Sequence, residues 1–370
     1  MRVLFQSREG LFTSPGGDTV QILKTKEYLE RLGVKVDISL ELEPNLKDYN
    51  IIHLFNLTTP EEIYPQLMNA KNQNKKVALS TIYVIYTEFE RKARGGIAQI
   101  IFNLLSPYTI QYLKSLIKTL KYRNFNKGRM YILTRGYYNI LKEITKNVDL
   151  FLPNSEGEMD NVKRDFNLKT PNYITIPNAV DHELFDYEKT IVNEAKQYEG
   201  CVLCVGRIEG RKSQLNVVRA MKGLPFKLVI IGKPAPNQMK YYNKVKKESG
   251  DNVVFIEQLS HEKLNQYYKV AKVNILASWM ETTGLVSLEA AVMNCNIVIT
   301  KKGHTEEYFK DYAFYCEPDN VDSIRNAILN AYNSPFNENF KSYILNNFIW
   351  EKTAENTFKG YKSILNTGNY

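Results

Sequence analysis

Two glutamates, Glu281 and Glu289, lie in the segment of the sequence with the clearest capacity for chemistry. Glu281 precedes a Thr-Thr-Gly loop at 282–284, and the residues from Leu285 onward are strong helix formers, so Gly284 is predicted to mark a helix start. On that helix Glu289 lies on the same inward face as Leu285, one turn earlier. A carboxylate on an apolar face requires a hydrogen-bond donor. Glu289 is therefore either a ligand-binding group or a partly exposed glutamate at the edge of a core helix.

Two cations follow a predicted strand at 202–205. Gly206 and Arg207 come directly after that strand, and Lys212 is predicted to begin the next helix. Ligands of open parallel sheets bind at the carboxyl ends of the strands, so Arg207 is placed to face such a ligand. Arg as a planar fork and Lys as a point charge suit a diphosphate. A solvated basic turn explains the same residues, and the sequence leaves both interpretations open.

Two further elements favour an anion. The helix that begins at Gly284 offers free N–H groups and the positive end of its dipole, and Thr282 and Thr283 are small enough to allow close approach. The pair Gly16–Gly17, in the N-terminal half, forms another Gly-rich loop, although a tight turn is its default interpretation.

A metal ion or other cofactor is not expected. Cys201 and Cys204 are spaced like a metal-binding pair, but they fall in a predicted strand, where residues three apart face opposite ways. Buried free thiols are the expected state of all four cysteines. The chain has no Asp-x-Asp pair, and Arg207, Lys212 and a helix N-terminus already supply positive charge for a diphosphate.

The elements that position these residues alternate between strand and helix. In the first half, a strand at 3–5, a Gly-rich turn, a helix and a strand at 34–38 form a βαβ unit. Further strands are predicted at 51–55, 77–80 and 150–152. A second series has strands at 202–205, 227–231, 253–256, 273–275 and 297–299. The charged stretch 186–200 is predicted to be an interdomain linker.

The pattern predicts an α/β chain of two Rossmann-like, doubly wound domains facing across a cleft, with boundaries at 1–183 and 184–349. A length of 370 residues agrees, because it is too long for one ordinary core. The N-terminus resembles no signal peptide, and no apolar stretch is long enough to cross a bilayer, so a cytoplasmic location is expected.

The positive charge of the chain is concentrated in one segment. The formal net charge is +9, and residues 91–150 alone carry twelve Lys or Arg against two acids. Within this segment a helix after Pro107 is predicted to place Ile110, Leu113, Ile117 and Leu120 on one face and Gln111, Lys114, Lys118 and Lys121 on the other. Such a helix either packs on its own domain or lies on a membrane. The positive charge favours peripheral binding to an anionic membrane. Nucleic acid is the less favoured anionic partner because no recognition motif is present.

Taken in order, these motifs resemble the retaining GT-B glycosyltransferases, specifically glycosyltransferase family 4. The matching segments are Gly16–Gly17, Pro153-Asn154-Ser155-Glu156, Ile176-Pro177-Asn178-Ala179-Val180-Asp181, Gly206-Arg207 with Lys212, the region from Ala277 to Glu289, and Trp350. The tryptophan precedes a last helix, about 350–370, that in this family crosses back onto the N-terminal domain. One such motif is weak, whereas the ordered set is specific.

The resemblance implies a role for each segment. Arg207 and Lys212 would hold the donor diphosphate, Glu289 the ribose hydroxyls, and Glu281 would lie beside the transferred sugar. The remaining donor-binding residues would be Gly16, Gly17, Gly206, Gly232, Lys233, Gln258, Leu259, Thr282, Thr283, Gly284 and Leu285. One departure concerns the acceptor side, because the stretch 79–83 lacks the histidine that the family often carries there.

The expected function is transfer of a sugar from a nucleotide-sugar to a lipid-linked or polysaccharide acceptor, with retention and without a metal. A role in cell-surface polysaccharide synthesis on the inner face of the membrane is expected. Two alternatives stay open: a catalytically degenerate scaffold or binding protein of the same fold at the membrane surface, and a sugar-nucleotide epimerase of GT-B architecture.

Overall fold

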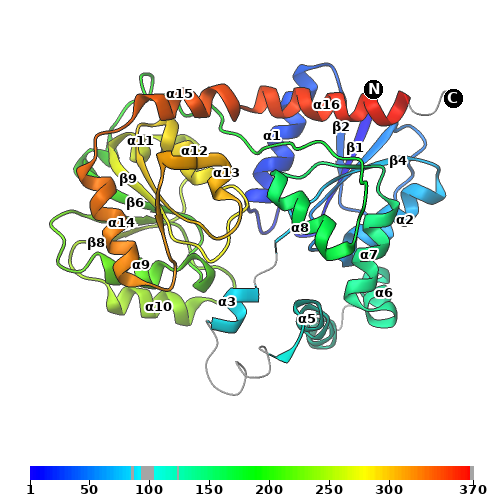
Figure 1. Cartoon of the computed structure of the whole chain (residues 1–370), viewed down its shortest axis with the longest axis horizontal. Coiled ribbons are helices and arrows are strands. Elements are labelled where there is room, and N and C mark those ends of the chain that lie inside the picture. Colours follow the sequence, from blue (N-terminus) through cyan, green and yellow to red (C-terminus); the bar gives the residue numbers. More distant parts are fainter. Residues whose placement is uncertain (85–86, 93–103, 123–124, 367–370) are drawn as a thin grey trace. The chain divides into compact units, whose positions relative to one another are not determined.

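The computed structural model describes residues 1–84, 87–92, 104–122 and 125–366 (Figure 1). The chain forms two compact units: unit 1 comprises Met1–Asn178 and Trp350–Tyr370, and unit 2 comprises Ala179–Ile349. The division falls at 178/179, whereas the sequence placed it at 183/184. The reason is local pairing, because the Val180 amide donates to the Phe348 carbonyl at 2.9 Å and fixes the start of unit 2 to its end.

The charged stretch 186–200 is part of unit 2, so the linker prediction was wrong. Its carbonyls at Tyr187 and Thr190 accept hydrogen bonds from the Lys269 ammonium at 2.6 and 3.0 Å. Ala195, in a short 3-10 turn (η1, Glu194–Tyr198), is fully buried. The segment is anchored by single residues and backbone groups, which leave no periodic pattern in a sequence.

Unit 1 contains a parallel sheet in the order β2-β1-β3-β4-β5. The strands are β1 (Arg2–Gln6), β2 (Lys35–Ser39), β3 (Ile51–Phe55), β4 (Lys76–Ser80) and β5 (Leu150–Phe151). The helices are α1 (Gly17–Arg31), α2 (Pro60–Asn72), α3 (Thr87–Lys92), α5 (Pro107–Tyr122), α6 (Lys127–Arg135), α7 (Tyr137–Asn147), α8 (Glu156–Phe166) and α16 (Trp350–Asn366). This is the flavodoxin-like order, whose strand order reverses between β1 and β3.

Unit 2 contains a second parallel sheet, in the order β11-β10-β9-β6-β7-β8. Its strands are β6 (Cys201–Val205), β7 (Leu228–Ile231), β8 (Val253–Ile256), β9 (Ala271–Leu276), β10 (Asn296–Thr300) and β11 (Phe314–Cys316). The α-helices are α9 (Gln214–Ala220), α10 (Met239–Glu248), α11 (His261–Val270), α12 (Leu285–Val292), α13 (Thr305–Phe309), α14 (Val321–Asn333) and α15 (Glu338–Asn347). This is the dinucleotide-binding order, and its switch point lies between β6 and β9.

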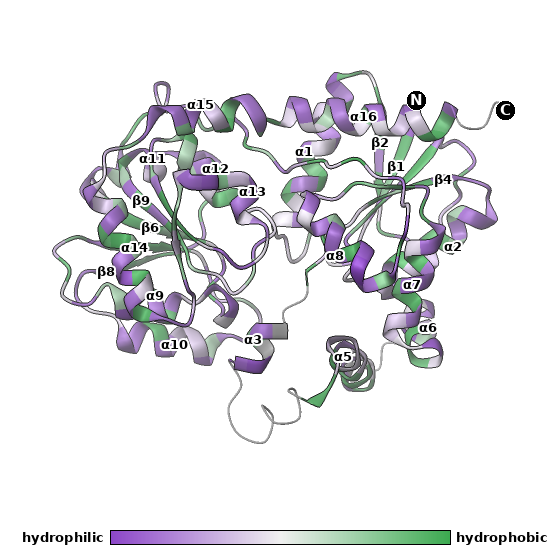
Figure 2. Cartoon of the chain, viewed as in Figure 1, coloured by the Kyte–Doolittle hydropathy of each residue, from purple (hydrophilic) through white to green (hydrophobic). Residues whose placement is uncertain are grey.

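The central strands are largely apolar because helices cover both faces of each sheet. All five residues of β3 and of β6 are buried, and β1 is coloured largely as hydrophobic in Figure 2. Within β6, Cys201 and Cys204 belong to different core clusters, on opposite faces of the sheet. All four cysteines are free and buried, and burial raises the pKa of both Cys201 and Cys204 to about 12.

The last helix, α16, is joined to the core of unit 1 by a buried polar chain. The Tyr361 hydroxyl lies 2.6 Å from Nδ1 of His53 on β3, and Nε2 of that ring lies 2.9 Å from the Ser80 hydroxyl on β4. Burial lowers the pKa of His53 to about 3, so the ring is neutral. A β-carbon on Gly360 would come within 2.9 Å of Leu150 on β5, so the helix lies close against the sheet.

Replacing Tyr361 with Phe should destabilise unit 1, because a buried nitrogen of His53 loses its partner. The expected loss in free energy of unfolding is about 1–3 kcal/mol, measured by urea denaturation followed by circular dichroism. Tyr131→Phe is the matched control, since its ring packs on Tyr64 and its hydroxyl has no hydrogen bond within the described ranges. The control should change stability by less than about 0.5 kcal/mol. Equal effects of the two substitutions would contradict this role of His53.

Candidate active site

The switch point of unit 2 brings together two of the residues predicted to do chemistry. The Lys212 ammonium, after β6, pairs with Oε1 of Glu281, after β9, at 2.5 Å. Their side chains are 23% and 12% exposed, so the pair is partly shielded from water. The same two loops are joined by the Trp279 amide, which donates to the Arg211 carbonyl at 2.8 Å. A Lys–Glu pair therefore stands at the position where open α/β sheets bind ligands.

Lys212 does not begin a helix, contrary to the sequence prediction. It ends a 3-10 turn (η2, Gly210–Lys212), and α9 begins only at Gln214. The residue between them, Ser213, has a left-handed backbone (φ +54°), which interrupts the helix. Its hydroxyl donates to the Pro318 carbonyl at 2.6 Å, a tertiary contact that stabilises the break.

Arg207 presents a cation without a protein partner at this edge. Its carbonyl accepts a hydrogen bond from Gln214 at 2.9 Å, but within the described residues its guanidinium forms no hydrogen bond or ion pair. The side chain is half-buried. Arg207 is thus positioned by its backbone while all five of its donors stay available to a ligand.

Two glycines bring the loops after β6 and β7 into backbone contact. A β-carbon on Gly232 (φ +152°) would lie 2.0 Å from the Gly206 carbonyl oxygen, a separation that no side chain tolerates. The Ile208 amide donates to the Lys233 carbonyl at 2.9 Å. Arg207 and Lys233 therefore follow neighbouring strands in loops that touch.

Glu281 is held by a similar contact with the loop after β10. Its amide donates to the Lys302 carbonyl, and its carbonyl accepts from the His304 amide, both at 3.0 Å. A β-carbon on Gly303 (φ +106°) would lie 1.9 Å from the Glu281 carbonyl oxygen. The position of the Glu281 backbone thus depends on a glycine more than twenty residues later in the chain.

Gly284 caps the start of helix α12, as predicted, and the helix itself begins at Leu285. Gly284 has φ +84°, and its carbonyl accepts from the Ser287 and Leu288 amides. The first helical N–H groups, those of Leu285 and Val286, have no partner within the helix. With the fully buried Thr283 and half-buried Thr282 before it, this end of α12 presents donors and a positive dipole to an anion.

Glu289 lies in the core of unit 2 and has a partner inside the protein. It is 7% exposed, and the Tyr268 hydroxyl on α11 donates to its Oε2 at 2.8 Å. Burial raises the pKa of Glu289 to about 8, the Tyr268 hydrogen bond lowers it, and the charge of Asp181 raises it further. Tyr268 is the donor that the sequence required, although its identity was not predictable. Oε1 has no hydrogen bond to a described residue, so it can still bind a ligand hydroxyl.

The remaining predicted donor-binding residues are divided between the units. Lys233 and Gln258 are exposed, and Leu259 is half-buried, at the ends of β7 and β8. Gly16 and Gly17 lie in unit 1, where Gly16 precedes α1. The Arg8–Asp18 ion pair at 2.6 Å closes that loop. The loop follows β1, beside the switch point of its own sheet.

The loop after β4, where the family histidine is absent, is organised by a buried glutamate. Glu158 accepts from the Tyr83 amide at 2.8 Å, from the Asn154 amide at 3.0 Å and from the Thr81 hydroxyl. Between Thr81 and Tyr83, Ile82 has φ +40°, a strained conformation for a β-branched residue, and such strain is often found at functional loops. Glu158 was not predicted from the sequence, although its spacing from Ser155 is that of a capping box.

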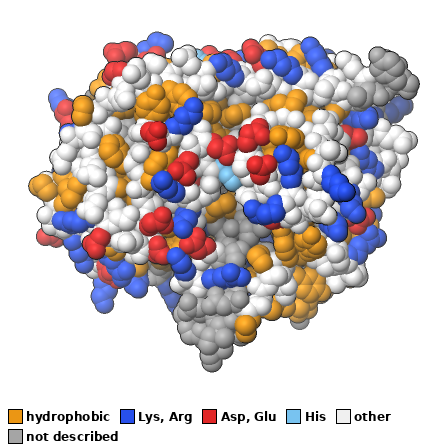
Figure 3. Space-filling view, in the orientation of Figure 1, with side chains coloured by type: hydrophobic (Ala, Val, Ile, Leu, Met, Phe, Trp, Pro, Cys, Tyr) orange, Lys and Arg blue, Asp and Glu red, His pale blue; other side chains and the backbone are white. Residues whose placement is uncertain are grey.

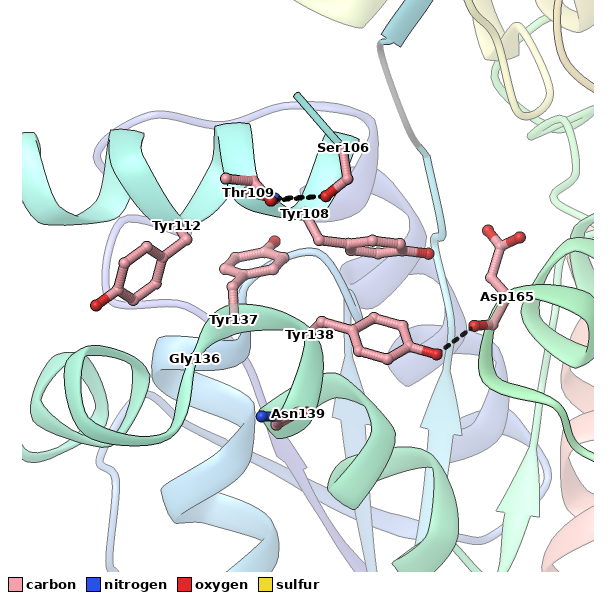
Figure 4. A pocket seen from close by; sticks show the side chains of 9 residues that line it. All are labelled: Ser106, Tyr108, Thr109, Tyr112, Gly136, Tyr137, Tyr138, Asn139 and Asp165. Carbon is pink, nitrogen blue, oxygen red and sulfur yellow. Dashed lines mark hydrogen bonds between the residues drawn. The ribbon is translucent and has the colours of Figure 1, made fainter. Parts of the chain in front are cut away.

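A cavity of about 500 Å³ lies in unit 1 between α5 and α7 (Figure 4). None of the predicted donor-binding residues lines it. The switch point of unit 2 remains the candidate donor site because it has the charged side chains and the backbone N–H donors. Across the described parts of the chain, no group of three or more His, Cys, Asp and Glu is arranged to hold a metal ion.

Comparisons with known proteins agree on one class. Residues 187–346 match the family model of glycosyl transferases group 1. An uncharacterised glycosyltransferase of Methanocaldococcus jannaschii is 28% identical over 44% of this chain and 45% of its own length. A D-inositol 3-phosphate glycosyltransferase of Mycobacteroides abscessus is 24% identical over 44% of this chain and 39% of its own. The chain thus spans less than half the length of these curated relatives.

Solved structures with the same fold cover the whole chain. Sucrose-phosphate synthase from Thermosynechococcus elongatus has a TM-score of 0.74 at 17% identity, with 100% of both chains covered. Anabaena HepE in complex with UDP has a TM-score of 0.68 at 14% identity, with 98% of this chain and 100% of that chain covered. The predicted fold class, two Rossmann-like domains as in GT-B glycosyltransferases, is confirmed.

Burial of Glu289 predicts a distinct pH dependence of stability. Its folded pKa of about 8 lies above that of an unfolded glutamate, so its stabilising contribution is complete below about pH 4.5 and is lost as pH rises toward 8. Relative to Glu289→Gln, the wild type should lose on the order of a few kcal/mol between these limits, measured by urea denaturation at several pH values. Glu199→Gln, at an exposed site, should follow the wild-type profile. Parallel profiles for Glu289→Gln and wild type would contradict the raised pKa.

Proposed function

We propose that this chain is a glycosyltransferase that moves a sugar from a nucleotide-sugar to an acceptor hydroxyl, with retention at the anomeric carbon and without a metal. The carrying observation is that the Arg207 guanidinium, at the end of β6 in unit 2 where Lys212 and Glu281 also meet, has no partner among the described residues. The match of residues 187–346 to group 1 glycosyl transferases supports a transferase enzyme. The structures of HepE with UDP and with UDP-glucose support a nucleotide-sugar donor.

The donor would be bound through its charges and hydroxyls. Arg207, Lys212 and the N–H groups at the start of α12 would hold the diphosphate. The ribose hydroxyls would donate to Glu289, whose Oε1 has no described partner. Glu281 would orient Lys212 through their ion pair and lie beside the sugar. Residues Gly232, Lys233, Gln258 and Leu259 would surround the base.

The chemical step would break the bond between the anomeric carbon and the diphosphate oxygen, and the electron pair would leave with that oxygen. Fixed positive groups stabilise this developing charge without reorganisation. In unit 2, the carboxylates at the site are engaged with Lys212 and Tyr268, so neither is a clear covalent nucleophile. The acceptor hydroxyl would therefore attack from the face that the diphosphate leaves and pass its proton to the departing diphosphate oxygen, which gives retention.

Arg207→Ala should lower turnover by roughly 10²–10³, as the loss of one preorganised charge-stabilising donor does. The measurement is release of nucleoside diphosphate from a panel of UDP- and GDP-sugars. Lys240→Ala, which removes an exposed cation of α10, should leave turnover near the wild-type value. Near-normal turnover of the Arg207 variant would rule out its assigned role.

The same panel separates the two alternatives. A sugar-nucleotide epimerase would convert the donor without any acceptor and release a changed sugar. A degenerate scaffold would bind nucleotide without turnover under any condition. The Arg207 guanidinium, without a partner in the described part of the chain, and the Lys212–Glu281 pair favour an active transferase over the scaffold.

The acceptor would be lipid-linked or a polysaccharide, assembled at an anionic membrane surface for cell-surface polysaccharide synthesis. Within the described residues, no helix has the length and apolar content needed to span a bilayer. Helix α5 instead exposes an apolar stripe: Leu113, Ile117 and Leu120 are 39%, 63% and 60% exposed, whereas Ile110 is buried. Figure 3 shows hydrophobic side chains over the region of α5 and α6, with Lys and Arg side chains nearby.

This exposure argues for peripheral membrane binding. A surface helix that packs on its own domain would bury its apolar face, but most of this stripe stays exposed. Lys114, Lys118 and Lys121 flank it, and each cation near an anionic leaflet contributes on the order of 1 kcal/mol. The apolar stripe would insert among the acyl chains while the lysines contact headgroups.

Substituting Leu113, Ile117 and Leu120 together with Ser should abolish flotation with liposomes that contain anionic phosphatidylglycerol. The control replaces Leu23 and Leu32, exposed at 43% and 42% elsewhere in unit 1, and should float like the wild type. Failure of the wild type to float at low salt, or equal flotation of the triple variant, would discard membrane binding through α5.

A further inference from the structure

The cavity between α5 and α7 is walled by tyrosines. Tyr108 and Tyr112 come from α5, and Tyr137 and Tyr138 from the start of α7 (Figure 4). The rings of Tyr108 and Tyr138 lie 4.8 Å apart between centroids, inclined by 56°. The cavity volume of about 500 Å³ is within the range of small-molecule sites. Four aromatic side chains thus border one hollow.

Hydrogen bonds hold these rings in place. The hydroxyls of Tyr112, Tyr137 and Tyr138 donate to the carbonyls of Leu133, Thr58 and Asp165 at 3.1, 3.0 and 2.9 Å. The Tyr108 hydroxyl lies 2.8 Å from that of Tyr83. Because each phenol is already satisfied, the rings offer their faces and edges to a guest, in fixed orientations.

Polar groups complete the lining. Ser106, Thr109 and Asn139 are exposed at its rim. The carboxylate of Asp165 accepts from Tyr83 at 3.0 Å and from the Arg164 guanidinium at 2.9 Å, and is 15% exposed. Among the described lining residues there is no Lys or Arg. Such a lining disfavours a phosphate, and its polar rim disfavours a purely apolar chain.

The cavity also borders the carboxyl edge of the unit 1 sheet. Tyr83 follows β4 and Thr58 follows β3, and each is joined by a hydrogen bond to a tyrosine that lines the cavity. Ligands of open parallel sheets bind at that edge. The hollow is therefore placed where unit 1 would receive a ligand.

We propose that this cavity binds a carbohydrate, the glycan part of the acceptor. A pyranose ring combines an apolar C–H face, which packs on a tyrosine ring, with hydroxyls at its edge, which suit Asp165, Asn139, Thr109 and Ser106. Fixed aromatic faces and a neutral-to-acidic rim match an uncharged sugar. The statement that this glycan belongs to the acceptor rests on the proposed transferase function. The statement that the cavity binds a sugar is independent of that function.

The test is saturation-transfer-difference NMR on the full chain with octyl β-glucoside below its micellar concentration, and with maltose and N,N′-diacetylchitobiose. Ring protons of at least one probe should receive saturation. Tyr108→Ala and the cavity-filling Asn139→Trp should each weaken that binding by about fivefold or more, as loss of an aromatic contact does. Asn139 is exposed, so its replacement leaves the fold intact even where Tyr108→Ala does not. Tyr173→Ala, in unit 1 but outside the cavity, is the matched control and should bind like the wild type.

Three outcomes overturn the proposal: no probe binds, saturation is confined to the octyl chain, or ring-proton binding is unchanged in both cavity variants. Calorimetry with UDP and GDP on the same proteins tests the donor site separately from the sugar-binding cavity. Sugar binding without nucleotide binding would defeat the transferase function and leave the cavity assignment standing. Nucleotide binding without sugar binding would defeat the cavity assignment and leave the transferase function standing.

Discussion

Close backbone contacts between loops at the carboxyl edge of the unit 2 sheet are the constraint on which the site depends. Gly232 touches the Gly206 carbonyl, and Gly303 touches the Glu281 carbonyl, at separations that would place a β-carbon within about 2 Å of backbone. These contacts fix the paths of the loops after four neighbouring strands. Charged side chains are then positioned by main chain, which loses little entropy when a ligand binds. Preorganisation of this kind is what stabilisation of a leaving diphosphate requires.

Electrostatic balance explains how the site stays stable without a ligand. Lys212 is paired with Glu281, so their charges compensate each other in a partly buried position. Burial keeps Glu289 largely neutral near pH 7, against the opposing effect of its hydrogen bond with Tyr268. Arg207 carries an uncompensated positive charge within the described part of this edge. An arriving diphosphate would therefore meet a site whose net charge favours it, while the carboxylates are already engaged.

Most of the fold was predictable because parallel strands are apolar on both faces and recur between helices. The ten strands expected from the sequence are present, and of the strands in the described ranges β11, three residues long, was missed. Local rules also placed the start of α12 at Gly284. The predictions that failed concern features set by distant contacts. Helix α9 begins only after Ser213 and so does not include Lys212, and Lys269 anchors the segment 186–200. Tyr268 becomes the partner of Glu289 only when separate helices pack, and the tyrosine cavity forms in the same way. No local sequence pattern predicts either feature.

The most direct test of the account is a crystal structure of the chain with UDP. The account predicts that the diphosphate contacts the Arg207 guanidinium and the amides at the start of α12, and that a ribose hydroxyl lies within hydrogen-bond distance of Glu289. A nucleotide bound away from the switch point between β6 and β9, or bound there with Arg207 turned away from the phosphates, would contradict it.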